Sequence, residues 1–457
     1  MGLETILNVG SPSNNMGLKI YNTEARKLQA FKPIEEGKVG IYVCGPTVND
    51  VPHLGHARQQ ITFDILRKYL EYSGYNVTFV SNVTDIDDKI IIKAEEQGVD
   101  MGELTEKNLA AHTEDYAKIG VKKPDVQPRA TEYVKEMIDL VQRLDDKGFT
   151  YTIEEDGVYY DVSKFEHYGN FSGQKREKLK AGARIGVKDK KRNPEDFVLW
   201  KFSKPGEPEW NSPWGKGRPN WHIECSAMSA NILGLPFDIH GGGQDLIFPH
   251  HENEVAQSEA AYGKKLANYW MHNGMVNVDN VKMSKSLGNF KTIRDLLAKY
   301  PGEVIRYFVL SSHYRKPIDF SEETLGNAQN SYERLKNILE DLEDDGEKND
   351  KYLKKYREGM DNDLNTPVAL STLWQLVRDQ NAKGKYQTIQ EIDEVLGLKL
   401  LEKKEIDIPE NIQKLVQERL DARRNKNWEL ADKKRDEISQ LGYQVDDTLD
   451  GSKIKKK

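Results

Sequence analysis

The chain has 457 residues, of which 37% are hydrophobic and 31% charged, and its formal net charge is −7. This length exceeds one ordinary domain, so we expect two to four domains. No apolar run approaches the roughly 20 residues needed to cross a bilayer, and the N-terminus lacks the features of a secretory signal. We therefore expect a cytoplasmic protein without a membrane partner. Only two cysteines are present, which excludes a disulfide scaffold.

The first patterned segments predict a βαβ unit. Residues 1–15 are polar and without periodicity, and we interpret them as a flexible extension. Residues 39–44 form a short apolar run that predicts a buried strand. Apolar residues at helical spacing then predict a helix over 54–72, and residues 77–80 begin a second strand. Strand, helix and strand within about 45 residues predict a parallel sheet and an α/β fold.

The remaining chain divides by composition. Charged helical stretches and then a turn-rich part make residues 95–215 an expected insertion within an α/β domain that spans 16–320. From about residue 321 the pattern is helical, with one segment over 321–405 and another over 406–457. We therefore expect an α/β domain with an inserted subdomain, followed by helical modules.

Three short motifs suit a nucleotide. His53-Leu54-Gly55-His56 lies where the first strand passes into its helix, and the N–H groups of a helix N-terminus suit triphosphate; alternatively, the histidines merely cap the helix. Lys282-Met283-Ser284-Lys285-Ser286 places two mobile cations in a small loop, which alone would be typical of a solvated loop. His240-Gly241-Gly242-Gly243-Gln244-Asp245 allows a close backbone approach to a ligand and offers a carboxylate for ribose.

The first two motifs resemble the two signature motifs of class I aminoacyl-tRNA synthetases, and the residues around them resemble the cysteine-specific family. The resemblance implies a Rossmann-type catalytic domain over 16–320, in which 275–320 holds the lysine-rich loop and a stem-contact region. It further implies a helical bundle over 321–405 and a small anticodon-binding region over 406–457. The implied protein is a monomer that activates L-cysteine with ATP and Mg²⁺ and transfers it to the terminal adenosine of tRNA(Cys).

The resemblance also implies the roles of the motif residues. His53, His56, Lys282 and Lys285 would stabilise the charge that develops during adenylation. ATP would be bound by His53, Gly55, His56, Gly243, Asp245 and Lys285.

Four further residues form a candidate metal site. His250 and Glu254 share one helix face at i and i+4, and with Cys44 and Cys225 they make a plausible zinc ligand set. Spacing alone would equally suit two buried cysteines and a solvated helix face. The resemblance covers all four positions and implies one Zn²⁺ per chain that takes the substrate sulfur as an added ligand, which would reject serine.

Other contacts are implied with less support from the residues themselves. Thr84 and Trp221 would line the cysteine pocket. Between Lys414 and Arg435 there are eight Lys or Arg against four Asp or Glu, which suits RNA but is also typical of a solvated helix face. The expected tRNA contacts are Arg423, Arg424, Trp428, Arg435 and, at an anticodon base, Asp447.

Two rival functions stay open at this point. A cysteine ligase of mycothiol synthesis has the same motifs, but it lacks a tRNA-reading tail such as 406–457 would supply. A non-catalytic RNA-binding paralogue would show no cysteine-dependent exchange of pyrophosphate with ATP.

Overall fold

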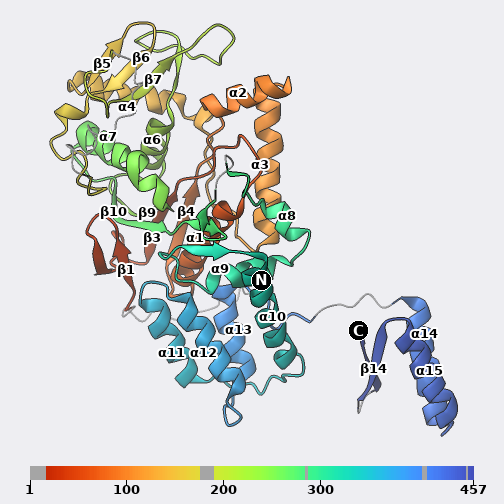
Figure 1. The fold of residues 1–457 in the computed structure, drawn as a ribbon. Coiled ribbons are helices and arrows are strands. Elements are labelled where there is room, and N and C mark those ends of the chain that lie inside the picture. Colours follow the sequence, from red (N-terminus) through yellow and green to blue (C-terminus); the bar gives the residue numbers. More distant parts are fainter. Residues whose placement is uncertain (1–16, 175–189, 284–286, 404–408, 449–450, 457) are drawn as a thin grey trace, which may run out of the picture. The chain divides into compact units, whose positions relative to one another are not determined.

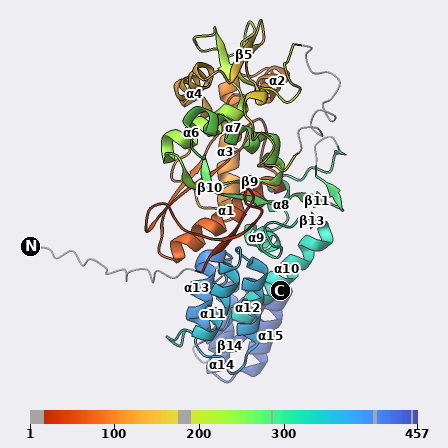
Figure 2. The ribbon, with the colours of Figure 1, turned by 90° about the vertical axis from the view of Figure 1, so that its left-hand side faces the viewer.

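The computed structural model describes residues 17–174, 190–283, 287–403, 409–448 and 451–456. The chain forms two compact units, residues 1–401 and residues 402–457. Figures 1 and 2 show the first unit with its sheet between an upper, inserted layer and a lower helical bundle.

A four-stranded parallel sheet with the order β10-β9-β3-β4 lies at the centre of the first unit. Strands β3 (Lys38–Val43) and β4 (Asn76–Ser81) are joined through helix α1 (Leu54–Tyr72), which confirms the predicted βαβ unit. Strands β9 (Phe237–Gly243) and β10 (Ala267–Asn273) extend the sheet on the other side of β3. The strand order therefore reverses beside β3, and ligands of open α/β sheets bind at such a switch point.

Helix α1 is buried over most of its length because its apolar side chains recur at helical spacing. Ile61, Ile65, Leu66 and Tyr69 are each at most 2% exposed, and α1 contacts β4, β9 and β10. Tyr69 continues this packing toward the helical bundle, where it meets the ring of Tyr356. The sheet and the bundle thus share one hydrophobic core.

The segment between β4 and β9 forms the inserted layer. The prediction of helices followed by turns is wrong for its second half, which contains an antiparallel sheet with the order β5-β6-β7-β8. These strands are only three to six residues long, and 36 residues separate β6 from β7, so no local alternation marks them as one sheet. The elements of the layer are α2 (Asp88–Gln97), α3 (Met101–Lys118), α4 (Val134–Asp146), β5 (Thr150–Ile153), β6 (Gly157–Tyr160), β7 (Phe197–Phe202), β8 (Gly217–Pro219) and α6 (Trp221–Leu233).

Smaller elements surround the sheet. An antiparallel hairpin opens the described chain, and a three-stranded sheet with the order β12-β11-β13 follows the parallel sheet. Their bounds are β1 (Lys19–Asn22), β2 (Lys27–Ala30), α7 (Glu252–Tyr262), β11 (Val276–Val278), β12 (Val281–Lys282), α8 (Ile293–Leu297), α9 (Gly302–Leu310) and β13 (Ile318–Phe320).

The helical bundle consists of α10 (Glu322–Leu339), α11 (Asp350–Asp361), α12 (Thr366–Arg378) and α13 (Lys385–Leu396), and it confirms the predicted helical segment. A buried ion pair joins it to the sheet domain: Arg306 of α9 lies 2.5 Å from Asp64 of α1 and also donates to the carbonyl of Leu396. Since removal of one partner leaves a buried charge unpaired, this contact holds α1, α9 and α13 in one arrangement.

The second unit pairs two helices with a β-hairpin. Helices α14 (Glu410–Arg424) and α15 (Trp428–Gln440) are followed by β14 (Tyr443–Thr448) and β15 (Gly451–Lys456). A small core forms from Ile412, Val416, Ile438, Tyr443 and Val445. The helical pattern expected from about residue 321 therefore does not extend to β14 and β15.

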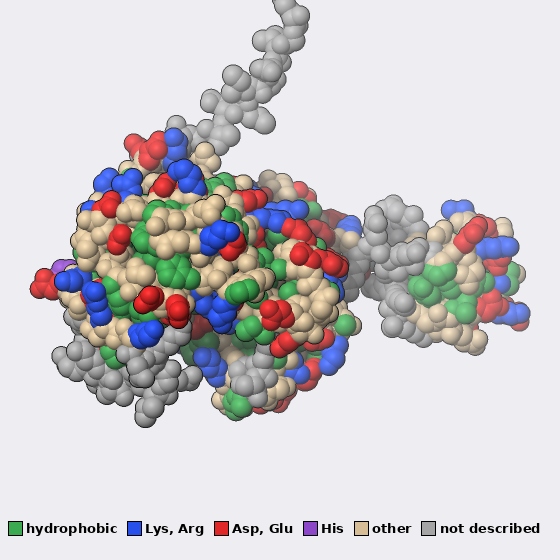
Figure 3. Space-filling model, turned by 90° about the horizontal axis from the view of Figure 1, so that it is seen from above, with side chains coloured by type: hydrophobic (Ala, Val, Ile, Leu, Met, Phe, Trp, Pro, Cys, Tyr) green, Lys and Arg blue, Asp and Glu red, His purple; other side chains and the backbone are tan. Residues whose placement is uncertain are grey.

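Among the described helices, none combines the length and the apolarity that a membrane crossing requires. Acidic and basic side chains are interspersed on the face of the molecule shown in Figure 3.

Candidate active site and metal centre

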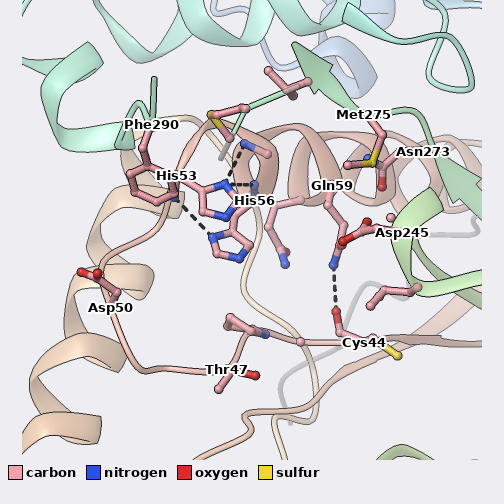
Figure 4. A pocket seen from close by; sticks show the side chains of 18 of the residues that line it. Cys44, Thr47, Asp50, His53, His56, Gln59, Asp245, Asn273, Met275 and Phe290 are labelled. Carbon is pink, nitrogen blue, oxygen red and sulfur yellow. Dashed lines mark hydrogen bonds between the residues drawn. The ribbon is translucent and has the colours of Figure 1, made fainter. Parts of the chain in front are cut away.

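A cavity of about 470 Å³ lies at the carboxyl end of β3. Its walls come from the turn after β3, the start of α1, the end of β9 and the β11–β12 segment (Figure 4). The structure thus brings together His53 and Lys282, which are 229 positions apart in the sequence (282 − 53). The predicted site residues that line the cavity are Cys44, His53, Gly55, His56, Trp221, Gly243, Asp245 and Lys282; Lys285 lies outside the described residues.

The two histidines of the first motif form a reciprocal cap on α1. His53 Nδ1 accepts from the backbone N–H groups of Gly55 (3.0 Å) and His56 (3.3 Å), and His56 Nδ1 accepts from the N–H of His53 at 3.3 Å. The N–H of Leu54 donates to the carbonyl of Lys291. The interpretation that this helix end offers free N–H groups to phosphate is therefore wrong for this structure. The stacked rings of His53 and His56, with 3.7 Å between their centroids, line the cavity in place of these N–H groups (Figure 4).

The glycine-rich motif closes another side of the cavity. Gly243 ends β9, and a Cβ placed there would lie 2.4 Å from Asp245 Oδ1, so a side chain at this position would displace the carboxylate from its present place. Asp245 points into the cavity beside Gln59, whose side-chain amide donates to the carbonyl of Cys44 at 2.8 Å (Figure 4). The motif thus presents an exposed carboxylate to the cavity.

Sulfur, nitrogen and oxygen donors meet around Cys44. The Cys44 Sγ lies 3.4 Å from His250 Nε2, 3.3 Å from His251 Nε2 and 3.6 Å from Glu254 Oε1. Ligand atoms of these four residues all lie within 4.8 Å of one another, a grouping that is compatible with a metal ion. The Sγ of Cys225, from the second turn of α6, lies 3.6 Å from the Cys44 Sγ.

A second set of histidines holds these donors in place. His240 Nε2 donates to Glu254 Oε2 at 2.7 Å, and the Nδ1 atoms of His222 and His250 are 2.9 Å apart. His251 Nδ1 lies 2.7 Å from His272 Nε2. Such outer contacts fix the orientation of metal-ligating side chains and the ring nitrogen that each histidine presents.

The group concentrates negative charge although it is buried. Burial acts to raise the pKa of Glu254, but the neighbouring His240 and His250 lower it well below its usual value. Burial likewise opposes ionisation of Cys225, yet hydrogen bonds with Cys44 and His250 lower its pKa to about 6. Burial would lower the pKa of His250, whereas the Glu254 carboxylate raises it to about 10. By contrast, burial and the neighbouring Cys225 and Glu254 raise the pKa of the Cys44 thiol well above its usual value, so Glu254 and Cys225 are the donors that favour the anionic form.

The two residues expected to line the cysteine pocket lie differently. Trp221 lines the cavity, and its ring stacks on that of His250 with 4.1 Å between centroids. Thr84 is fully buried and does not line the cavity, and its hydroxyl donates to Glu224 Oε2 at 2.6 Å. Only Trp221 therefore presents its side chain to the cavity.

Both the sheet domain and the helical bundle of the first unit match known protein families. Residues 30–330 match the family "tRNA synthetases class I (C) catalytic domain", and residues 355–401 match the DALR domain. The cysteine–tRNA ligase of Thermococcus onnurineus is 48% identical, with 96% of this chain and 98% of that protein covered. The corresponding ligase of Clostridioides difficile is 45% identical, with 96% and 100% covered. The chain belongs to the cysteine–tRNA ligase family.

Solved class I synthetases share the fold of this family member. Mycobacterium tuberculosis methionyl-tRNA synthetase, in complex with methionyl-adenylate, has a TM-score of 0.59 at 16% identity, with 80% of this chain and 89% of that chain covered. Agrobacterium radiobacter leucyl-tRNA synthetase, in a ternary complex, has a TM-score of 0.57 at 10% identity, with 81% and 84% covered. These likenesses support the parallel-sheet architecture.

Several residues of this ligase-family site were missed by sequence reasoning. His251 stands next to His250, and the i, i+3 spacing to Glu254 was a signal that could have included it. His240 is part of the glycine-rich motif, but nothing in that motif marks it as a partner of Glu254. His272 and Gln59 carry no local signal, since their contacts depend on sheet pairing and on helix packing.

The expected RNA contacts of the family member lie in the second unit. Arg423 lies with its guanidinium 5.6 Å from the ring centroid of Trp428, which is 57% exposed. Arg424 and Arg435 approach the carboxylates of Asp421 and Asp432 on their own helices. Asp447 belongs to β14, and its side chain lies outside the described part of the structure.

Proposed function

We propose that the protein is a cysteine–tRNA ligase that forms cysteinyl-adenylate and pyrophosphate from L-cysteine and ATP, and then charges tRNA(Cys). One observation carries the proposal: thiols, imidazole and carboxylate meet at Cys44, at the edge of the cavity that the nucleotide motifs line. Family membership supports the same reaction, since the relatives named cysteine–tRNA ligase match almost the whole chain.

The donor set fits zinc. Tetrahedral Zn²⁺ keeps two sulfurs about 3.8 Å apart, and a sulfur and a nitrogen about 3.5 Å apart. The Cys44 and Cys225 sulfurs are 3.6 Å apart, and Cys44 Sγ and His250 Nε2 are 3.4 Å apart. With Glu254 these residues would hold one Zn²⁺ per chain. His251 is a further donor, since its ligand atom lies within 4.8 Å of those of Cys44, His250 and Glu254. A zinc ion there would favour a substrate thiolate strongly over the neutral hydroxyl of serine.

The other cavity residues would bind and orient the reactants. Lys282 and Lys285 would contact phosphate oxygens as mobile cations, together with Mg²⁺. The imidazoles of His53 and His56 would donate to the same developing charge, because the α1 N–H groups are already bonded. Asp245 would accept from the ribose hydroxyls beside Gly243. The cysteine carboxylate then attacks the α-phosphate of ATP, and pyrophosphate leaves. Because the substrate itself is the nucleophile, the enzyme needs only to position the two reactants.

The second unit would contact tRNA. The exposed Trp428 with Arg423 offers a stacking face and a cation, and Arg424 and Arg435 would add phosphate contacts. We assign Asp447 to an anticodon base. We further propose that the protein acts as a monomer in the cytoplasm.

Replacement of Cys225 tests the proposal. In Cys225→Ala, cysteine-dependent exchange of pyrophosphate into ATP should fall by at least about a hundredfold, because a ligand of the proposed zinc is removed. Bound zinc, measured by metal analysis of the same preparation, should fall with it. Ser229→Ala is the matched control, since it removes a buried polar atom one turn further along α6. Unchanged discrimination against serine in Cys225→Ala would reject the zinc mechanism.

A further inference from the structure

A buried carboxylate of α3 lies outside the catalytic cavity and is paired with a cation of α8. Asp115 is fully buried, and both of its carboxylate oxygens accept from Arg294 Nε at 3.1 Å. Within the described chain no other side chain donates to this carboxylate. Because a buried carboxylate without its cation is strongly destabilised, Asp115 holds Arg294 in one place. Neither residue lines the cavity, and the reaction proposed above gives them no role.

The buried contact, and not the exposed one beside it, fixes Arg294. Its Nη2 also lies 3.0 Å from Glu114 Oε2, but the Glu114 side chain is exposed, and an exposed ion pair contributes little to stability. The Arg294 side chain itself is 45% exposed, so packing around it does not hold it. Since Arg294 belongs to α8, its contact with Asp115 joins α8 to α3 (Figure 1).

Helix α8 is bonded in turn to the start of the first nucleotide motif. The N–H of Leu54 donates to the carbonyl of Lys291 at 3.0 Å, and the N–H of Ile293 donates to the carbonyl of Pro52 at 3.0 Å. These two bonds pair the chain on either side of His53 with the chain that enters α8. The position of His53 therefore depends on the position of α8.

Two further contacts hold the same motif. Phe290, which precedes α8, lies edge-on to the ring of His53 with 4.9 Å between centroids, and both rings line the cavity (Figure 4). From α3, His112 Nε2 lies 2.9 Å from the carbonyl of Asp50, three residues before His53. Helix α3 thus supports this motif directly, and it supports it a second time through α8.

We propose that Arg294 is a positioning residue for adenylate formation: paired with Asp115, it holds α8 on α3 and thereby keeps the His53 imidazole where the phosphates of ATP react. This rests on the proposed function, which assigns His53 to the charge that develops there. Stabilisation of a transition state is sensitive to a misplacement of about 1 Å. None of the proposed metal ligands belongs to α3 or α8, so cysteine binding should not depend on this ion pair.

The test is the double neutral variant Arg294→Met/Asp115→Asn in the full chain, which removes the ion pair without leaving a buried charge unpaired. The kcat of cysteine-dependent pyrophosphate exchange should fall about tenfold or more, while the KM for cysteine changes by less than about twofold. Bound zinc should stay at the level of the unaltered protein. Arg294→Lys alone should retain most of the exchange rate, because lysine keeps a cation opposite Asp115.

The matched control is Lys299→Met/Glu322→Gln, which neutralises an exposed ion pair just after α8 in the same way. An unchanged kcat in the Arg294→Met/Asp115→Asn protein, or an equal fall in the control, would overturn the proposal. A parallel rise of the KM for cysteine with loss of bound zinc would also overturn it, since the ion pair would then support the fold as a whole. Failure of the proposed function is separate, because the unaltered protein would then show no cysteine-dependent exchange.

Discussion

His240 lies outside the group of donor residues but contacts one of its members, Glu254. Its Nε2 donates to Glu254 Oε2 at 2.7 Å, and both side chains are fully buried. We predict that His240→Leu lowers zinc affinity by about ten- to a hundredfold, as for other outer partners of metal ligands. Competition with a chromophoric chelator measures this. His240→Gln, which keeps a donor, should recover part of the affinity; equal affinities in all three proteins would contradict the assignment.

We predict that the buried His112 makes the folded protein less stable in acid. Burial lowers the pKa of this imidazole to about 4, and its nitrogens lie 2.9 Å from the Asp50 carbonyl and 3.0 Å from the Tyr116 hydroxyl. In the unfolded chain the His112 imidazole binds a proton near pH 6.5, whereas in the folded protein it does so only near pH 4. Acidification between these values therefore favours unfolding, and stability is lost as the pH falls.

The corresponding measurement is urea unfolding at pH 7 and pH 5. Between pH 7 and pH 5 the free energy of unfolding should decrease in both proteins. The decrease should be about 2 kcal/mol smaller in His112→Gln than in the unaltered protein. His167→Gln, at an exposed position, is the control. If the two variants lose the same stability on acidification, His112 is not the responsible group.

At the scale of elements, contact between β9 and α1 depends on Gly241. A Cβ placed there would lie 2.2 Å from the ring of Phe63, a fully buried residue of α1. We predict that Gly241→Ala destabilises the protein by about 1–3 kcal/mol through overpacking, seen as a lower Tm. Phe63→Leu in the same chain should remove part of that loss, since the two sites share one contact.

The matched control for this element is Gly326→Ala. Gly326 lies inside α10 with nothing within 4 Å of an added Cβ, so alanine should be neutral or stabilise by up to about 1 kcal/mol. A Gly241→Ala protein as stable as the Gly326→Ala protein would show that α1 and β9 are not so tightly packed.

At the scale of the whole molecule, we expect the first unit to suffice for adenylate formation and the second unit to be needed for efficient charging of tRNA. Every residue that lines the catalytic cavity lies in the first unit. A chain that ends at Leu401 should therefore keep cysteine-dependent pyrophosphate exchange, while its kcat/KM for tRNA falls at least about tenfold through the loss of basic contacts. Circular dichroism checks its folding. Full charging of tRNA by this shortened chain would contradict a role of the second unit in RNA binding.

The sequence by itself determined the local elements and the family. The βαβ unit and the bundle helices follow from periodicity within a few residues, and the short motifs around His53 and Lys282 carry the resemblance that the comparisons confirmed. Only the tertiary structure decided which side chains meet. Cys44 and Cys225 are 181 positions apart, and Thr84 turns to Glu224 instead of the cavity.

The β5–β8 sheet and the contact of His251 with His272 were likewise outside local patterns. Strand pairing and helix packing between distant segments set these contacts, because no neighbouring residues encode them.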